Sequence, residues 1–162
     1  MKITSFDKVR LERGGEILNG SPTIDDIMSA MQVAYDENGM EGPPELALEC
    51  VSSSPSSEAP QTHLYMLLAF HRTHPPRWLI HYITPRAVGV SGLLSSGRTS
   101  EMQFELRAVC GTISLYRQDC LIHDPVLFRK AIAWFVEHYD ACPELAWIPY
   151  DEAVHDADNR IE

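Results

Sequence analysis

The residues with the clearest potential for catalysis are a cysteine and the histidine that follows it. Cys120 lies three residues before His123, and Asp124-Pro125 then begins a predicted helix. A thiol beside a histidine and a helix N-terminus is a candidate nucleophile. The same position equally suits a small apolar side chain at the end of a strand. We therefore expect a buried structural thiol, with a small Cys/His hydrolase as the less favoured alternative.

Histidines near a turn raise the question of a metal site. His71 and His74 flank the turn H-R-T-H-P-P-R, and His63 and His81 are nearby in sequence. Zinc requires three or four converging ligands, and H-x-x-H in a proline-containing loop lacks the helix that orients the rings in H-E-x-x-H. We expect no metal and no other cofactor, with His63 and His81 at the core edge or on the surface.

Other catalytic patterns are missing from the sequence. It contains no G-x-S-x-G elbow, no glycine loop leading from a strand to a lysine, and no dinucleotide fingerprint. Acidic pairs such as Asp25-Asp26 are neighbours in sequence, so their carboxylates do not face each other across a pocket as an acid/base pair would. These observations predict a protein that is not an enzyme and has no small-molecule substrate.

The charge is strongly acidic and unevenly distributed. The formal net charge is -10, and residues 1–70 carry 11 acids against 4 bases, residues 71–130 carry 4 against 8, and residues 131–162 carry 8 against 1. An acidic field repels nucleic acid and membrane surfaces and steers basic partners toward the protein. Solubility alone is an equally good reason for such a charge.

Localisation is predicted from what the sequence lacks. No apolar run approaches the roughly 20 residues of a membrane span, and residues 1–10 have no secretory pattern. The four cysteines are scattered, which suits reduced thiols better than a disulfide framework. We expect a cytoplasmic protein.

The helix that begins at Asp124 is the clearest element. Asp124 suits the N-cap and Pro125 the first helical position. Its apolar face is formed by Phe128, Ala131, Ile132, Phe135 and Tyr139, with Leu127 and Trp134 widening it. Pro143 is predicted to end the helix, and residues 145–148 to return Trp147 to the same core. Replacing Trp134 or Trp147 by alanine is therefore expected to cost about 3 to 5 kcal/mol.

A second helix is predicted over residues 24–37. Thr23 and Asp26 have capping-box spacing, and Asn38-Gly39 supplies the left-handed residue that ends helices.

Arg13-Gly14-Gly15 indicates a hairpin. Alternating or continuous apolar runs predict strands at residues 3–6, 9–11, 16–18, 45–51, 64–70, 78–83, 101–109 and 112–116. Residues 52–61 are predicted to be a mobile Ser/Pro loop, and residues 85–98 a long flexible connection with a short strand at 87–90.

This order of elements favours an α+β fold. We expect a mainly antiparallel sheet of about five to seven strands, with two helices packed on one face. Residues 1–150 form one domain in this interpretation, and residues 151–162 are an acidic tail that frays.

The C-terminal half is similar to the first-numbered immunity protein family of bacterial polymorphic toxin systems. The resemblance rests on the helical motif A-x-x-W-F-V at residues 131–136, then Pro143, and Trp147 four residues later. It extends over residues 23–148, because the early helix and the apolar strands fall in matching places. It implies a cytoplasmic immunity protein that binds and neutralises the toxic C-terminal domain of a cognate effector, often a nuclease or nucleic-acid deaminase.

Acids in predicted turns are the candidate toxin-binding residues, because they reach a partner without disturbing the fold. They are Asp36, Glu37 and Glu41 after the first helix, and Glu144, Asp151 and Glu152 after the second. A basic toxin surface would accept them in place of phosphate. The same acidity fits an effector secretion chaperone, which holds its partner unfolded, so this alternative stays open.

Overall fold

The computed structural model describes residues 6–37, 46–51, 64–71, 77–83, 92–97, 104–109 and 112–156. In chain order, its elements are β1 (Lys8–Arg13), β2 (Glu16–Asn19), α1 (Ile24–Glu37), β3 (Leu46–Val51), β4 (Leu64–His71), β5 (Arg77–Ile83), β6 (Gly92–Ser95), β7 (Phe104–Val109), β8 (Thr112–Arg117), the 3-10 turn η1 (Gln118–Cys120), α2 (Pro125–His138), β9 (Ala146–Pro149), α3 (Tyr150–Ala153) and β10 (Val154–Asp156).

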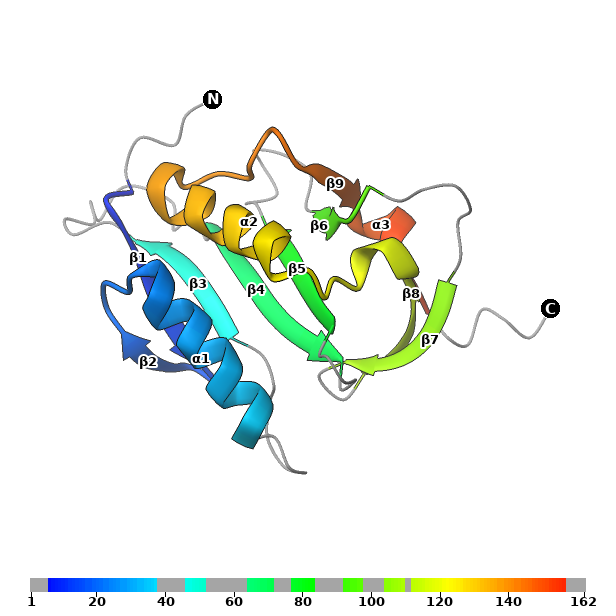
Figure 1. Ribbon diagram of the computed structural model, residues 1–162, viewed down its shortest axis with the longest axis horizontal. Helices are drawn as coiled ribbons and strands as arrows, with labels where there is room; N and C mark the ends of the chain where they lie inside the picture. The colour runs from blue at the N-terminus through cyan, green and yellow to red at the C-terminus, as the bar shows by residue number, and fades with distance from the viewer. Residues whose placement is uncertain are drawn as a thin grey trace, which may run out of the picture.

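Seven of the strands form one antiparallel sheet, which confirms the predicted α+β class. The strand order is β2-β1-β3-β4-β5-β6-β9, and each neighbouring pair is antiparallel (Figure 1). The two apolar runs β4 and β5 lie near its middle, with Leu67 opposite His81, as their apolar composition predicts. In the described chain, no helix is both long and apolar enough to span a membrane.

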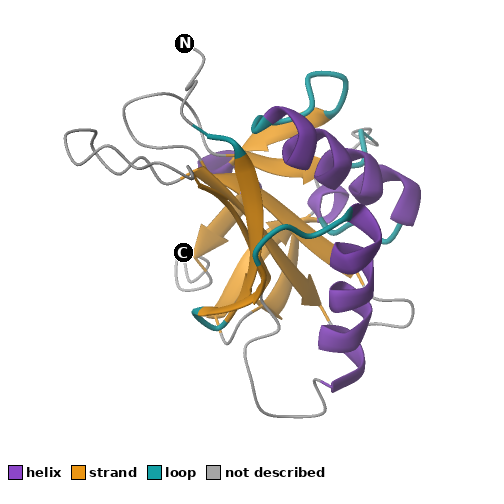
Figure 2. Cartoon of the chain, turned by 90° about the vertical axis from the view of Figure 1, so that its left-hand side faces the viewer, coloured by secondary structure: helices purple, strands orange, loops and turns teal. Residues whose placement is uncertain are grey.

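Both long helices cover one face of this sheet, as expected (Figure 2). Ile27, Met31 and Ala34 of α1 are buried against the sheet. The predicted face of α2 is buried over Phe128, Ala131, Ile132 and Phe135. The strands contribute every second residue to the same core, namely Val9, Leu11, Leu46, Leu48, Cys50, Met66, Leu68, Trp78, Ile80 and Tyr82.

Side-chain caps fix where the helices begin. The backbone N–H of Asp26 donates to the Thr23 hydroxyl at 3.1 Å, and the Thr23 N–H donates to the Asp26 carboxylate at 2.9 Å, which confirms the capping box. Asp124 accepts from the Val126 N–H at 2.9 Å.

The end of α2 differs from the prediction, because the helix stops at His138, before Pro143. Tyr139 adopts the left-handed conformation there with φ 57°, and its N–H still bonds to the Phe135 carbonyl.

The two tryptophans of the C-terminal motif occupy different environments. Trp147 packs against the main core, and its indole N–H donates to the Cys142 carbonyl at 2.9 Å. Trp134 is only partly buried and stacks on the exposed His138 ring, with centroids 3.8 Å apart. The expectation that Trp134 belongs to the core is therefore wrong. Trp134 lies at the edge of the buried face of α2, where it contacts the exposed His138.

A second, three-stranded sheet was not predicted. Its order is β10-β8-β7, and it lies beside the large sheet in Figure 1. A separate apolar cluster joins the two, made of Leu79, Leu93, Tyr116, Cys120, Leu121 and Ala153. Leu79 alternates with Trp78 and Ile80 along β5, so this cluster lies on the sheet face away from α1 and α2.

The end of the chain is more ordered than the sequence indicates. The predicted frayed tail at 151–162 is wrong for its first part, because residues 150–153 form α3 and residues 154–156 pair with β8. The fully buried Ala153 anchors this segment in the second cluster. Residues 157–162 lie outside the described residues.

A buried strand replaces part of the predicted flexible connection. Residues Gly92–Ser95 form β6, and all four are buried between β5 and β9. Glycine suits position 92, because a Cβ atom there would lie 3.0 Å from the Ile148 carbonyl oxygen, which is closer than most Cβ contacts. Four predicted features fall largely or wholly outside the described residues. They are the strands at 3–6 and 87–90, the Ser/Pro loop and the helix end at Asn38-Gly39.

Candidate functional site

The predicted toxin-binding acids do not form one surface. Asp36 and Glu37 lie together at the end of α1, at the bottom of Figure 1, whereas Asp151 and Glu152 lie on α3 at the right. Glu144 precedes β9 and is paired with Lys130 of α2, whose hydrogen bond lowers the pKa of Glu144. Glu41 falls outside the described residues. The described acids therefore lie at separate places on the molecule.

Cys120 does not have the environment of a nucleophile. Its side chain is fully buried in the second apolar cluster. Burial, together with the charge of Asp119, raises the pKa of the Cys120 thiol to about 12. The thiol is protonated at neutral pH, whereas attack requires the thiolate. His123 is exposed, at the surface before α2. The structure therefore agrees with the expectation of a structural thiol.

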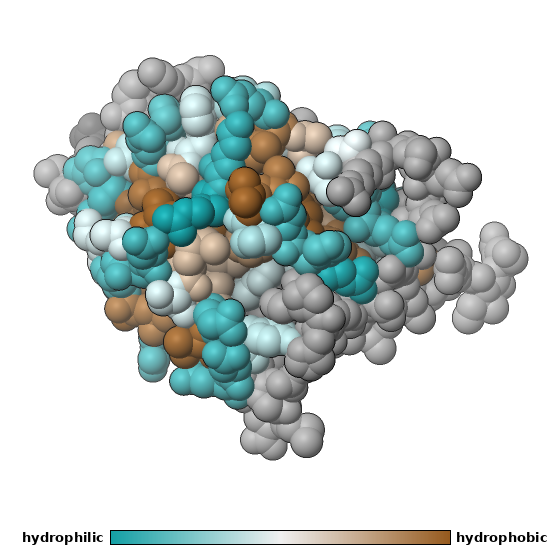
Figure 3. Space-filling model, viewed as in Figure 1, coloured by the Kyte–Doolittle hydropathy of each residue, from teal (hydrophilic) through white to brown (hydrophobic). Residues whose placement is uncertain are grey.

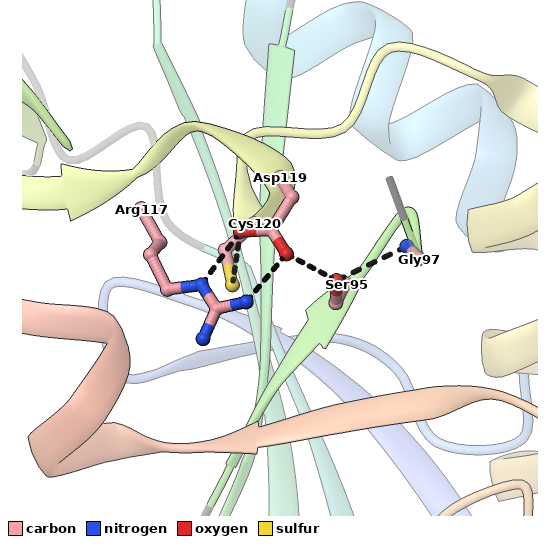
Figure 4. Close-up of polar contacts among 5 residues, drawn as sticks. All are labelled: Ser95, Gly97, Arg117, Asp119 and Cys120. Atoms are coloured by element: carbon pink, nitrogen blue, oxygen red, sulfur yellow. Dashed lines mark hydrogen bonds and ion pairs between the residues drawn. The ribbon is translucent and has the colours of Figure 1, made fainter. Parts of the chain in front are cut away.

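A buried ion pair accompanies Cys120 (Figure 4). The Arg117 guanidinium donates to both Asp119 carboxylate oxygens, at 2.8 and 2.9 Å, and the Ser95 hydroxyl donates to Oδ2 at 2.8 Å. The Ser96 N–H donates to the Asp119 carbonyl at 2.7 Å, and the Gly97 N–H donates to Ser95 Oγ at 3.1 Å. These bonds connect the end of β6 in the large sheet with η1 and the end of β8.

The network has a structural rather than a catalytic character. Burial by itself raises the pKa of Asp119, but hydrogen bonds from Arg117 and Ser95 and the charge of Arg117 outweigh it, so the pKa lies below its usual value. Such a carboxylate is ionised at neutral pH and is a poor proton donor or acceptor. Because both of its oxygens are occupied by Arg117 and Ser95, Asp119 serves to join the two sheets.

The histidines do not converge on a metal within the described residues, where no group of three or more His, Cys, Asp or Glu side chains is arranged to hold an ion. His63 and His74 lie outside that part, and the placement of the His71 side chain is not described. His81 lies on the face of β5 away from the long helices, stacked on Tyr150 with centroids 4.8 Å apart. Its Nε2 atom is buried and, among the described residues, has no hydrogen-bond partner.

His81 makes stability depend on pH. Burial lowers the pKa of His81 from 6.5 to about 4, so the unfolded chain takes up a proton at a higher pH than the folded protein. The free energy of unfolding is therefore expected to be unaffected by this group above pH 6.5 and to fall as the pH drops toward 4, by on the order of 2 to 3 kcal/mol. Urea unfolding at pH 7.5, 6, 5 and 4.5 measures this loss.

The variant His81→Leu should flatten this pH dependence and, by removing the orphan nitrogen, leave stability at pH 7.5 unchanged or higher. His123→Gln, at an exposed position, is the control for losing a histidine as such. A His81→Leu protein whose stability still falls as steeply as wild type between pH 6.5 and 4.5 would rule out this group as the cause.

Comparisons with known proteins give no relative for this chain. No family model matches it, and neither a curated protein nor a solved structure does so.

The surface that sequence reasoning missed is the one formed by β2 and α1. Residues 14–37 contain five acids and no lysine, arginine or histidine. They also hold three of the large hydrophobic side chains that are exposed, Ile17, Leu18 and Val33. The absence of basic residues from 14–37 can be read from the sequence. Only the structure shows that exposed apolar side chains lie in the same segment. We call Glu16–Asn19 together with α1 the acidic β2–α1 surface.

Proposed function

We propose that this chain is a cytoplasmic immunity protein that binds and neutralises the toxic C-terminal domain of a cognate bacterial effector. The toxin is a nuclease or a nucleic-acid deaminase, whose surroundings must be basic to hold phosphate. The resemblance of the α2–β9 motif supports the family, and the α+β architecture is compatible with it. The observation that carries the proposal is the position of Asp36 and Glu37.

Asp36 and Glu37 occupy the last turn of α1, which contains no basic residue. The C-terminal end of a helix carries partial negative charge, so an acid there is unfavourable by about 0.3 to 1 kcal/mol. Arg13 compensates Glu37 at 3.0 Å, whereas Asp36, among the described residues, accepts a hydrogen bond from Gln32 at 2.9 Å and has no ion pair. Acids kept at an unfavourable position are well explained by a basic partner that they contact.

The test is to express the protein with the toxin domain encoded by the gene immediately upstream. Production of that domain alone in a bacterial host is expected to stop growth, and co-production of this protein to restore it. The two should co-purify, with the domain folded and its nuclease or deaminase activity abolished. Continued killing in the presence of this protein would contradict the proposal. Binding only to the unfolded domain would instead indicate a secretion chaperone.

The α1 acids predict a specific charge effect on association. Asp36→Lys is expected to slow association with the toxin domain by about threefold to tenfold at low ionic strength, and by much less at high salt, because ions screen the attraction. Glu144→Lys and Asp151→Lys change the net charge equally at distant places and serve as matched controls. Stopped-flow association rates against salt concentration give the comparison. Equal slowing by all three variants would assign the effect to net charge and not to this surface.

The structural role of Cys120 gives a further expectation for the same assay. Cys120→Ser should keep full protection wherever the variant folds, since the buried, protonated thiol takes no part in binding. Loss of protection by a folded Cys120→Ser protein would favour the hydrolase alternative.

A further inference from the structure

Among the described residues, the outer strand of the large sheet has no neighbour along one backbone edge. In the described chain, β2 is the terminal strand and pairs only with β1. Ile17 and Leu18 remain 57% and 51% exposed. The opposite edge strand, β9, is less suited to pairing with an added strand, because it contains Pro149, which has no N–H to donate, and leads directly into α3. Open edges with apolar side chains bind added strands, and β2 is the edge that offers both features.

The hairpin geometry determines which backbone groups of β2 point outward. Gly14 and Gly15 have φ 58° and 85°, which is the conformation of a two-residue hairpin turn. Arg13 and Glu16 face each other across this turn. In such a turn that pair exchanges its own hydrogen bonds, so the N–H of the next residue, Ile17, is directed to the open edge.

The helix α1 lies along this edge, and residues 14–37, which include β2 and α1, carry acids and no lysine, arginine or histidine. Arg13 pairs with Glu37 at one end of β2, and the Asn19 amide donates to Asp26 at 3.3 Å at the other. The exposed Val33 adds an apolar side chain on α1. Figure 3 shows hydrophobic atoms surrounded by hydrophilic ones at the lower left, over β2 and α1.

We propose that the open edge of β2 binds an extended, basic segment of the partner as an added strand. Apolar side chains of that segment contact Ile17 and Leu18, and its lysines or arginines face Glu16 and Asp36. This inference rests on the proposed function and assigns the neutralising contact to one surface. Pairing of two copies of this chain through β2 is disfavoured, because it would bring two base-free acidic segments together.

The decisive variant is Ile17→Pro, which removes the outward N–H and leaves the β1–β2 hydrogen bonds in place. Proline is tolerated in edge strands, so the thermal midpoint should stay close to that of the wild type. Binding to the upstream toxin domain is expected to weaken about tenfold or more, whereas Ile17→Val, which keeps the N–H, should bind as wild type does. Glu16→Lys is a second variant with an intact backbone, and should also weaken binding, more at low salt than at high salt.

A synthetic probe tests the surface without the toxin. A blocked nine-residue peptide of alternating lysine and valine should shift the amide resonances of residues 16–19 and of α1, and a glutamate–valine peptide should not. Ile17→Pro should abolish the shifts. Shifts elsewhere, or none, would overturn the proposal, as would concentration-dependent dimerisation of the protein that Ile17→Pro removes.

The two proposals fail in distinguishable ways. One outcome is that wild type, Ile17→Pro and Glu16→Lys neutralise the toxin domain equally. In that case the immunity function is supported, and the assignment of binding to the open edge of β2 is wrong. If the lysine–valine peptide binds at β2 while the upstream domain is neither bound nor inhibited, the immunity function is wrong. The open edge of β2 is then still a binding site for an extended basic segment, and its partner is another basic protein.

Discussion

Asp119→Ala is expected to lower the free energy of unfolding by about 3 to 5 kcal/mol, because it removes the carboxylate that is hydrogen-bonded to a buried arginine. The Arg117 and Asp119 side chains are only 8% and 9% exposed, and the carboxylate also accepts from Ser95. Loss of the carboxylate removes the hydrogen bonds that Arg117 and Ser95 donate to it, and the longer one from the Cys120 thiol, at the junction between β6, η1 and β8. Urea unfolding at pH 7 measures the change in free energy.

An exposed pair of the same chemistry provides the control. Arg129 and Asp25 are 2.8 Å apart, but their side chains are 49% and 84% exposed. Asp25→Ala is therefore expected to cost less than about 1 kcal/mol. The double variant Arg117→Met with Asp119→Leu should recover much of the loss, because it removes both charges together. If Asp119→Ala were as mild as Asp25→Ala, the pair would have to be hydrated in solution.

The contributions of Asp119 and His81 to stability are lost in different pH ranges, so a pH series distinguishes them. Because the pKa of Asp119 is lowered, its contribution is complete above the pKa of an unfolded aspartate and is lost as the pH falls through the folded value. That window lies below about pH 4. The loss due to His81 occurs above it, between pH 6.5 and about 4.

Phe135→Ala is expected to destabilise the protein by about 3 to 5 kcal/mol, because it opens a cavity where α2 meets the sheet. Phe135 is fully buried, and its ring and that of Tyr82 form a T-shaped pair with centroids 6.1 Å apart. Its neighbour Trp134 is larger but lies at the margin of the helix against His138. Trp134→Ala should therefore cost at most about 1.5 kcal/mol, well below what a core tryptophan would cost.

Urea midpoints of the two variants, measured side by side, test this contrast. Since both residues are aromatic and adjacent on α2, helix propensity and residue type differ little between them, and burial accounts for the difference. A Trp134→Ala midpoint as low as that of Phe135→Ala would show that Trp134 is part of the core in solution.

Local rules in the sequence determined most of the secondary structure. The Thr23–Asp26 capping box and Asp124-Pro125 placed both helix starts, because these interactions involve residues within one turn of each other. The 3.6-residue period of α2 identified Phe128, Ala131, Ile132 and Phe135 as its buried face. The glycine pair after Arg13 identified the hairpin, since few residues adopt positive φ at two successive positions.

The tertiary structure alone decided how these elements form surfaces. Trp134 and Phe135 are adjacent aromatic residues that were both expected in the core, and only the packing of α2 on the sheet leaves Trp134 partly exposed while it buries Phe135. The predicted acids are separated because α1 ends at the bottom of Figure 1, whereas β9 and α3 lie next to each other at its upper right. The tail forms β10 because a polar segment gains order when it pairs with β8 and buries Ala153. The physical reason is common to these cases: side-chain burial and strand pairing depend on contacts between residues far apart in the chain, which no local pattern encodes.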